Sequence, residues 1–161
     1  MTPDELTQQW VELRDRIKGF IAGRIAQKDD EEDLLQDVFI RIYTKLPQVR
    51  EETRIAQWIY QVTRNTLIDY HRKKSKDYTT TVELDNYQIL SQEREETLTQ
   101  EFATCIIPMI ANLPEKYRTA VHLAEIEGRS QKDLSRELQL SYSGAKSRVQ
   151  RGRRLLLSDL N

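Results

Sequence analysis

The sequence contains little cysteine, glycine or proline and no long apolar run. Its 161 residues include one cysteine, five glycines and four prolines. A single Cys105 excludes an internal disulfide and a zinc site built from several cysteines, and so few turn-forming residues argue against a turn-rich β fold. The absence of any run of 18 apolar residues predicts no membrane span. With 38% hydrophobic and 32% charged residues, the composition favours helices around a modest core.

The sequence also lacks the residue patterns of an enzyme. It has no glycine-rich phosphate loop, no H-x-x-x-H motif and no G-x-S-x-G motif. Its two histidines, His71 and His122, stand far apart with no partner at ligand spacing. We therefore expect no catalytic residue, no metal and no other cofactor. The start, MTPDELTQQW, lacks the basic and then apolar order of a signal peptide, which predicts a cytoplasmic protein.

Residues 130–154 predict two helices joined by a tight turn. Ser130 and Ser141 are expected to cap the two helices, because a serine hydroxyl accepts a hydrogen bond from an unpaired amide of the first turn. Gln139 and Leu140 would form the turn. The second helix is basic, with no acidic residue from 141 to 157. A short support helix followed by a basic one indicates a helix-turn-helix, whose second helix enters the major groove of DNA.

The net charge of −1 is unevenly distributed along the chain. Residues 1–76 carry 14 basic and 13 acidic side chains, residues 77–100 carry 1 and 6, and residues 101–161 carry 10 and 7. The basic C-terminal part therefore follows a strongly acidic segment. This pattern favours DNA binding that is aided by a partner over strong binding by the free protein.

Helical spacing of apolar residues recurs through the first half of the chain. It predicts helices over residues 8–27, over 33–46, which ends before Pro47, and from Thr53 to about Lys74. The second of these helices has a predicted inner face of Leu34, Leu35, Val38, Phe39, Ile42, Tyr43 and Leu46. In the third, basic residues are interleaved with Trp58, Tyr60 and Tyr70, which suits a groove for unpaired nucleic acid.

Two further helices are predicted before the helix-turn-helix. Residues 102–113 are apolar on one side, and Pro108 within them predicts a kink or a helix start. Cys105 is most simply a small core residue there. Pro114 suits the first position of a helix that ends at Gly128.

Two blocks of sequence, in this order, resemble the extracytoplasmic-function (ECF) sigma factors of bacterial RNA polymerase. The block LPEKYRTAVHLAEIEGRSQKDLSRELQLSYSGAKSRVQRGRRLL resembles their region 4, and SGAKSRVQRGR within it resembles the sigma-Z type subgroup. DLLQDVF resembles the region 2.2 helix, and WIYQVTRNTLIDYHRKK resembles the region 2.3–2.4 helix. The resemblance covers nearly the whole chain, from about Thr7 to Leu157.

The resemblance implies an all-α protein with two small helical domains. Residues 1–76 would form a region 2 bundle, residues 77–100 an acidic linker, and residues 101–161 a region 4 helix-turn-helix. Region 2 would bind core polymerase and help to melt the −10 element, while region 4 would read the −35 duplex. A linker of 24 residues reaches about 80 Å when extended, which spans two turns of duplex at about 34 Å each.

The resemblance also assigns roles to residues at matching positions. The exposed polar residues expected to bind core polymerase are Asp33, Gln36 and Asp37. Those expected to contact the −10 element are Arg64, Asn65, Arg72 and Lys73. Residues early in the second helix of the helix-turn-helix, expected at −35 base edges or nearby phosphates, are Tyr142, Ser143, Lys146, Ser147 and Arg148. Residues expected at −35 phosphates are Arg151, Arg153 and Arg154. The expected partners are core RNA polymerase and promoter DNA, with an anti-sigma factor as a further candidate and no membrane.

Two other classes of protein fit parts of the pattern. A free-standing helix-turn-helix regulator would use its N-terminal half as a dimerisation or sensor module and would bind palindromic sites as a dimer. An anti-sigma-like or scaffold protein would leave the basic helix unexplained. A sigma factor instead predicts a monomer, a site in two unlike parts and little DNA binding without polymerase.

Overall fold

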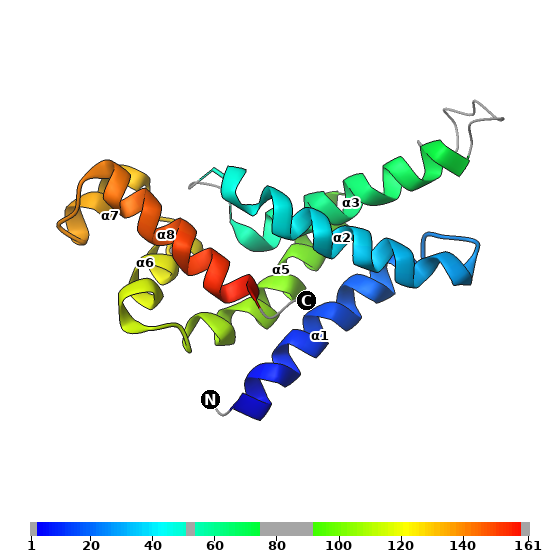
Figure 1. Cartoon of the computed structure of the whole chain (residues 1–161), viewed down its shortest axis with the longest axis horizontal. Helices are drawn as coiled ribbons and strands as arrows, with labels where there is room; N and C mark the ends of the chain where they lie inside the picture. Colours follow the sequence, from blue (N-terminus) through cyan, green and yellow to red (C-terminus); the bar gives the residue numbers. More distant parts are fainter. Residues whose placement is uncertain (1–2, 51–53, 75–91, 159–161) are drawn as a thin grey trace.

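The computed structural model describes residues 3–50, 54–74 and 92–158, and their secondary structure is helical (Figure 1). The α-helices are α1 (Pro3–Ala22), α2 (Glu31–Lys45), α3 (Ile55–Lys74), α5 (Gln92–Ile110), α6 (Glu115–Glu125), α7 (Gln131–Glu137) and α8 (Tyr142–Leu157). Two short 3-10 helices, η1 (Lys28–Asp30) and η2 (Leu46–Gln48), precede and follow α2. The all-α class is confirmed. The predicted start of the third helix at Thr53 and the linker residues up to 91 lie outside the described residues.

Helices α1, α2, α3 and α5 pack around one larger core. Helix α2 contacts α1 and α3, and α5 contacts the same two helices. Fully buried residues from all four helices meet there, among them Ile17, Leu35, Ile59 and Phe102. The inner face predicted for residues 33–46 is confirmed at every position except Tyr43.

Tyr43 is the exception on the predicted inner face of α2. Its side chain is 39% exposed, while Leu35, Val38 and Ile42 are fully buried. The phenol turns away from the core because its hydroxyl donates a hydrogen bond to the carbonyl of Ser158, at 2.8 Å. The prediction of Tyr43 as a core residue is therefore wrong.

Helix α1 ends at Ala22, earlier than the predicted end at residue 27. The Arg24 guanidinium donates to the carbonyl of Phe20 at 2.8 Å and lies over the Phe20 ring at 3.8 Å from its centre. A basic side chain that satisfies a carbonyl of the last turn stabilises a helix end. Arg24 thereby fixes the point where the chain leaves α1 and turns toward η1.

Helix α5 begins before residue 102 and continues through Pro108. Its first residues, 92–100, fall in the predicted linker. It also runs through Pro108 to Ile110, so a helix start at Pro108 is wrong. A proline removes one backbone hydrogen bond, but Phe102, Ile106 and Met109 keep a continuous buried face that outweighs this cost.

Helices α6, α7 and α8 surround a second, smaller core. Its buried members are Ala120, Leu123, Ala124, Leu134, Ala145 and Val149. Helix α8 approaches α6 closely at Gly152, because a Cβ there would lie only 2.4 Å from Cγ2 of Val121 and 3.3 Å from Cβ of Tyr117. The absence of a side chain at Gly152 therefore allows the close approach of α6 and α8.

We expect Gly152→Ala to destabilise the protein. Alanine normally favours a helix interior by about 1 kcal/mol over glycine, but here the added methyl group overlaps the buried Val121 side chain. Overpacking of this kind costs about 1–3 kcal/mol. The free energy of unfolding, measured by urea denaturation, should fall accordingly.

Gly19→Ala is the matched control. A Cβ at Gly19, in α1, would meet no neighbouring atom within 4 Å, so this substitution should leave stability unchanged or raise it. If Gly152→Ala also raised the free energy of unfolding, the close approach of α6 and α8 would be contradicted.

Candidate nucleic-acid interface

Helices α7 and α8 form the helix-turn-helix that the sequence predicts. The Ser130 hydroxyl accepts a hydrogen bond from the Asp133 amide at 3.2 Å, and the Ser141 hydroxyl accepts one from the Gly144 amide at 3.0 Å. Both predicted caps are confirmed. A Cβ on Gly144 would lie 2.9 Å from the Ser141 hydroxyl oxygen, so glycine at this position leaves room for the cap of α8.

The turn between α7 and α8 depends on Gln139. Its φ angle of 55° is positive, and no other non-glycine residue of the described ranges shows this. A left-handed residue with a side chain costs about 1–2 kcal/mol, which explains why glycine is common at such turns. Leu138 and Leu140, on either side, pack against the smaller core and hold the turn in place.

Gln131 is a positioning residue that the sequence reasoning missed. It is only 3% exposed, and its side-chain amide donates to the carbonyl of Tyr142 at 2.8 Å. This bond joins the first residue of α7 to the first residue of α8, so it fixes the angle at which α8 leaves the turn. Helical spacing would have predicted the burial of Gln131, because it stands three residues before the buried Leu134 and so on the same side of α7.

The outer face of α8 carries most of the residues predicted for the −35 element. Its exposed side chains are Tyr142, Ser143, Lys146, Ser147, Arg151 and Arg154. Arg148 is partly buried. A basic, exposed face on the second helix of a helix-turn-helix has the chemistry needed for phosphates and for guanine edges.

Arg153 does not belong to that face. It is 1% exposed and forms an ion pair with Glu125, with Nη2 at 2.7 Å and Nε at 2.9 Å from Oε1. The prediction of Arg153 as an exposed phosphate contact is corrected here. Helical spacing explains the error, because Arg153 lies four residues after Val149 and three before Leu156, both of which are buried.

Helix α3 presents the four residues predicted for the −10 element. Asn65, Arg72 and Lys73 are exposed, and Arg64 is partly exposed. Because Asn65 precedes Arg72 and Lys73 by seven and eight residues, these three lie on one side of the helix. The three side chains thus lie along the second half of the helix.

The aromatic part of the α3 prediction is only partly supported. Tyr60 is 1% exposed and meets Phe20 edge to face, with ring centres 5.8 Å apart. Burial raises the pKa of Tyr60, and its ring cannot stack on a base from inside the core. Trp58 and Tyr70 are partly buried against the same core. The predicted groove for unpaired nucleic acid on α3 therefore excludes the Tyr60 ring, which is buried.

Helix α2 offers an exposed face with acidic and apolar residues. Asp33, Gln36 and Asp37 are all exposed, and their spacing places them on one side of the helix. Ile40 extends this face and is 58% exposed, which sequence reasoning missed. An exposed large apolar side chain beside polar ones is typical of a protein-binding surface.

The described residues show neither a metal centre nor a membrane-crossing helix. No three histidine, cysteine, aspartate or glutamate side chains among them converge as metal ligands would. None of their helices is both long and apolar enough to cross a bilayer.

Comparison with known proteins decides the family. Sigma-70 region 2 matches residues 10–77, and Sigma-70, region 4, matches residues 103–156. The RNA polymerase sigma factor SigZ of Bacillus subtilis (strain 168) is 44% identical over 144 residues, which cover 89% of this chain and 80% of that protein. This chain belongs to the sigma-70 family. Its sequence resemblance to ECF sigma factors is confirmed.

Other relatives of this sigma factor carry the ECF name. The ECF RNA polymerase sigma factor SigM of Bacillus subtilis (strain 168) is 28% identical over 97% of this chain and 93% of its own length. The ECF RNA polymerase sigma-E factor of Haemophilus influenzae is 27% identical over 89% of this chain and 83% of its own. The protein is an RNA polymerase sigma factor that directs promoter recognition, which decides against a free-standing regulator.

The two sigma regions share one core in this structure. The region 4 match begins at residue 103, within α5. Helix α5 nevertheless packs against α3 and α1, and the region 2 match contains all of α3 and most of α1. Leu156 and Leu157 of α8 also join the larger core. The C-terminal helices are therefore closely joined to the N-terminal ones.

Proposed function

We propose that this sigma factor reads a promoter in two parts while attached to core RNA polymerase. Helix α8 would lie in the major groove of the −35 element, and the second half of α3 would contact the −10 element. The observation that carries this proposal is the capped, exposed and basic α8, held by Gln131 at a fixed angle to α7. Such a helix matches the geometry of major-groove readers.

Within α8, position decides which contact each side chain makes. Tyr142, Ser143, Lys146, Ser147 and Arg148 would face base edges or nearby phosphates, because residues near the N-terminus of a recognition helix enter the groove most deeply. Arg151 and Arg154, further along, would neutralise phosphates. Arg153 has no part in this contact as long as it stays paired with Glu125.

The N-terminal contacts follow the same logic. Arg64, Asn65, Arg72 and Lys73 would contact the melted −10 strand, where cations meet phosphates and the amide meets a base. Asp33, Gln36 and Asp37 would bind core polymerase, and the exposed Ile40 adds apolar area to that surface. We further propose a cytoplasmic location and no chemistry of its own, with an anti-sigma factor as a candidate partner.

Arg148→Ala should change base preference within the −35 element. An arginine bidentate to guanine contributes about 1–3 kcal/mol of discrimination at one position, so its loss should relax the choice of base at that position alone. Binding of polymerase holoenzyme to a library of −35 sequences measures this directly.

Arg151→Ala is the matched control on the same helix. A phosphate contact has no base preference, so its loss should weaken all sequences alike and reduce the salt dependence of binding. Uniform weakening by Arg148→Ala would place Arg148 on a phosphate, and no effect from either substitution would contradict −35 reading by α8.

A further inference from the structure

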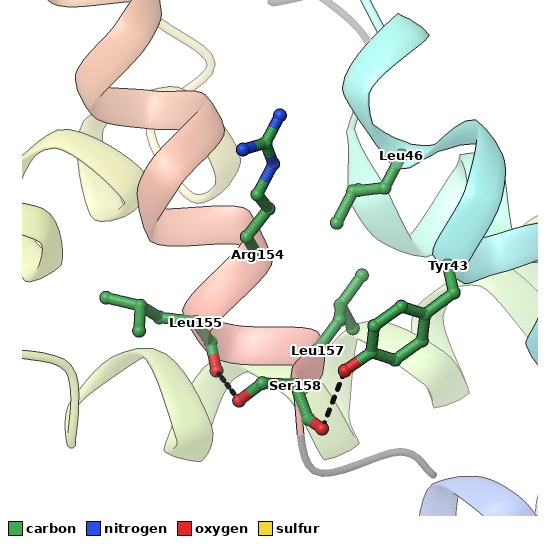
Figure 2. Close-up of a pocket in the computed structure, with 6 residues that line it drawn as sticks. All are labelled: Tyr43, Leu46, Arg154, Leu155, Leu157 and Ser158. Carbon is green, nitrogen blue, oxygen red and sulfur yellow. Dashed lines mark hydrogen bonds between the residues drawn. The ribbon is translucent and has the colours of Figure 1, made fainter.

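A cavity of about 380 Å³ lies between the end of α8 and the segment where α2 passes into η2 (Figure 2). The residues that line it are Tyr43, Leu46, Arg154, Leu155, Leu157 and Ser158. Small-molecule sites in proteins measure about 300–1,000 Å³, so this cavity has the size of a site for a small ligand. Apart from Arg154, none of these residues belongs to a surface proposed above for DNA or core polymerase.

Most of the cavity wall is apolar. Leu46 and Leu157 are buried and form its inner side, while Tyr43 and Leu155 are 39% and 45% exposed. Solvent therefore reaches the cavity along the two exposed side chains. Exposed large apolar side chains beside a cavity are typical of binding sites. An apolar body of roughly ten non-hydrogen atoms, small for a ligand because the cavity is near the lower size limit, would cover them.

The hydroxyl groups of Tyr43 and Ser158 already donate to partners within the protein. The Tyr43 hydroxyl donates to the Ser158 carbonyl at 2.8 Å, and the Ser158 hydroxyl donates to the Leu155 carbonyl at 2.8 Å (Figure 2). These bonds lie at the C-terminal end of α8, where the last carbonyls of a helix carry a partial negative charge. This end of the cavity therefore repels an anion and suits the apolar part of a ligand.

Arg154 is the charged residue of the cavity lining. Figure 2 shows its guanidinium directed away from Tyr43 and Ser158. Within residues 3–50, 54–74 and 92–158, the Arg154 side chain forms no ion pair or hydrogen bond. A guanidinium beside an apolar cavity is complementary to a carboxylate on an apolar body, because charge-assisted hydrogen bonds are about twice as strong as neutral ones. The lining therefore favours an apolar anion over a neutral or cationic ligand.

We propose that this cavity binds a small apolar carboxylate, with its apolar body against Leu46 and Leu157 and its carboxylate on the Arg154 guanidinium. The site lies beyond the proposed promoter reading but shares one residue with it. A carboxylate held on Arg154 cancels the charge that would otherwise neutralise a −35 phosphate. Occupancy of the cavity therefore removes one phosphate contact of α8, a consequence that rests on the proposed function.

Titration of the methyl-labelled full chain with octanoate, followed by NMR, tests the site. Octanoate carries one carboxylate on an apolar chain of the required size. We expect saturable shifts of the methyl signals of Leu46, Leu155 and Leu157, which line the cavity, and no comparable shift at the exposed Ile40 and Ile107. Shifts that spread over the exposed apolar side chains without saturation, or no shift at the three leucines, would overturn the site.

Charge separates this site from simple apolar adsorption. Octylamine, with the same chain and the opposite charge, should not shift the leucine signals at concentrations where octanoate saturates. Arg154→Gln should weaken octanoate binding by about tenfold, through loss of a charge-assisted contact. Arg151→Gln, also exposed on α8 but outside the cavity lining, is the matched control and should leave octanoate binding unchanged. Equal binding by Arg154→Gln and the unmodified chain would overturn the proposal.

The salt dependence of promoter binding by holoenzyme tests the consequence for DNA. Each neutralised phosphate contributes about 0.9 to the slope of log affinity against log salt concentration. Saturating octanoate should lower this slope as much as Arg154→Gln does, and should not lower it further in that variant. Octanoate that binds the cavity but leaves the slope unchanged would overturn the competition with phosphate. An unchanged slope for Arg154→Gln without octanoate would instead contradict the proposed −35 contact.

Discussion

Replacing Arg153 with methionine should destabilise the protein by about 3–5 kcal/mol, because it leaves a buried carboxylate without its charge partner. Glu125 is surrounded by protein, and burial raises the pKa of its carboxyl group even though Arg153 offsets part of that rise. The Arg153 guanidinium thus favours the charged form of Glu125 against the cost of its burial. Urea denaturation measures the loss as a fall in the midpoint.

Arg154→Met is the control for this prediction, because Arg154 is the exposed neighbour on the same helix. Its substitution should change stability by no more than about 0.5 kcal/mol. The double variant Glu125→Leu/Arg153→Met should recover much of the loss, since an apolar pair of similar volume removes both buried charges. Equal effects of Arg153→Met and Arg154→Met would contradict the buried ion pair.

Replacing Phe102 with alanine should cost about 3–5 kcal/mol, the range for removing a large aromatic side chain from a core. Phe102 is fully buried in α5, in the core that α5 shares with α1 and α3. The effect should appear as loss of stability of the N-terminal helices, and hydrogen exchange of α1 and α3 amides would report it there.

Ile107→Ala, on the exposed side of α5, is the matched control. Ile107 is 45% exposed, so its truncation should change stability only slightly. If Phe102→Ala left hydrogen exchange in α1 and α3 unchanged and affected only α6 to α8, the packing of α5 onto region 2 would be contradicted.

The local features of this protein could be predicted from its sequence because their causes are local. Ser130 and Ser141 cap helices whose amides lie three residues away, and the buried faces follow from helical spacing. The turn at Gln139 was also predictable, since α7 and α8 are each marked by their caps. Exposure of Asp33, Gln36 and Asp37 follows from the same periodicity.

The contacts between distant parts of the chain could not be predicted. Arg153 finds its partner 28 residues away, and Tyr43 bonds a carbonyl 115 residues away. Helical spacing alone gives the face of each residue but not what covers that face. An arginine in a basic helix and a tyrosine in an apolar stripe were therefore given their usual roles, and both differ in the structure.

Transcription by purified core polymerase, with and without this protein, is the most direct test of the account. The templates would be a library of candidate promoters that vary at −10 and −35. We expect discrete transcripts only when both components are present, with aligned start sites that share a −10 and a −35 element. Stable binding to palindromic DNA as a dimer, with no binding to core polymerase and no transcripts, would contradict the account.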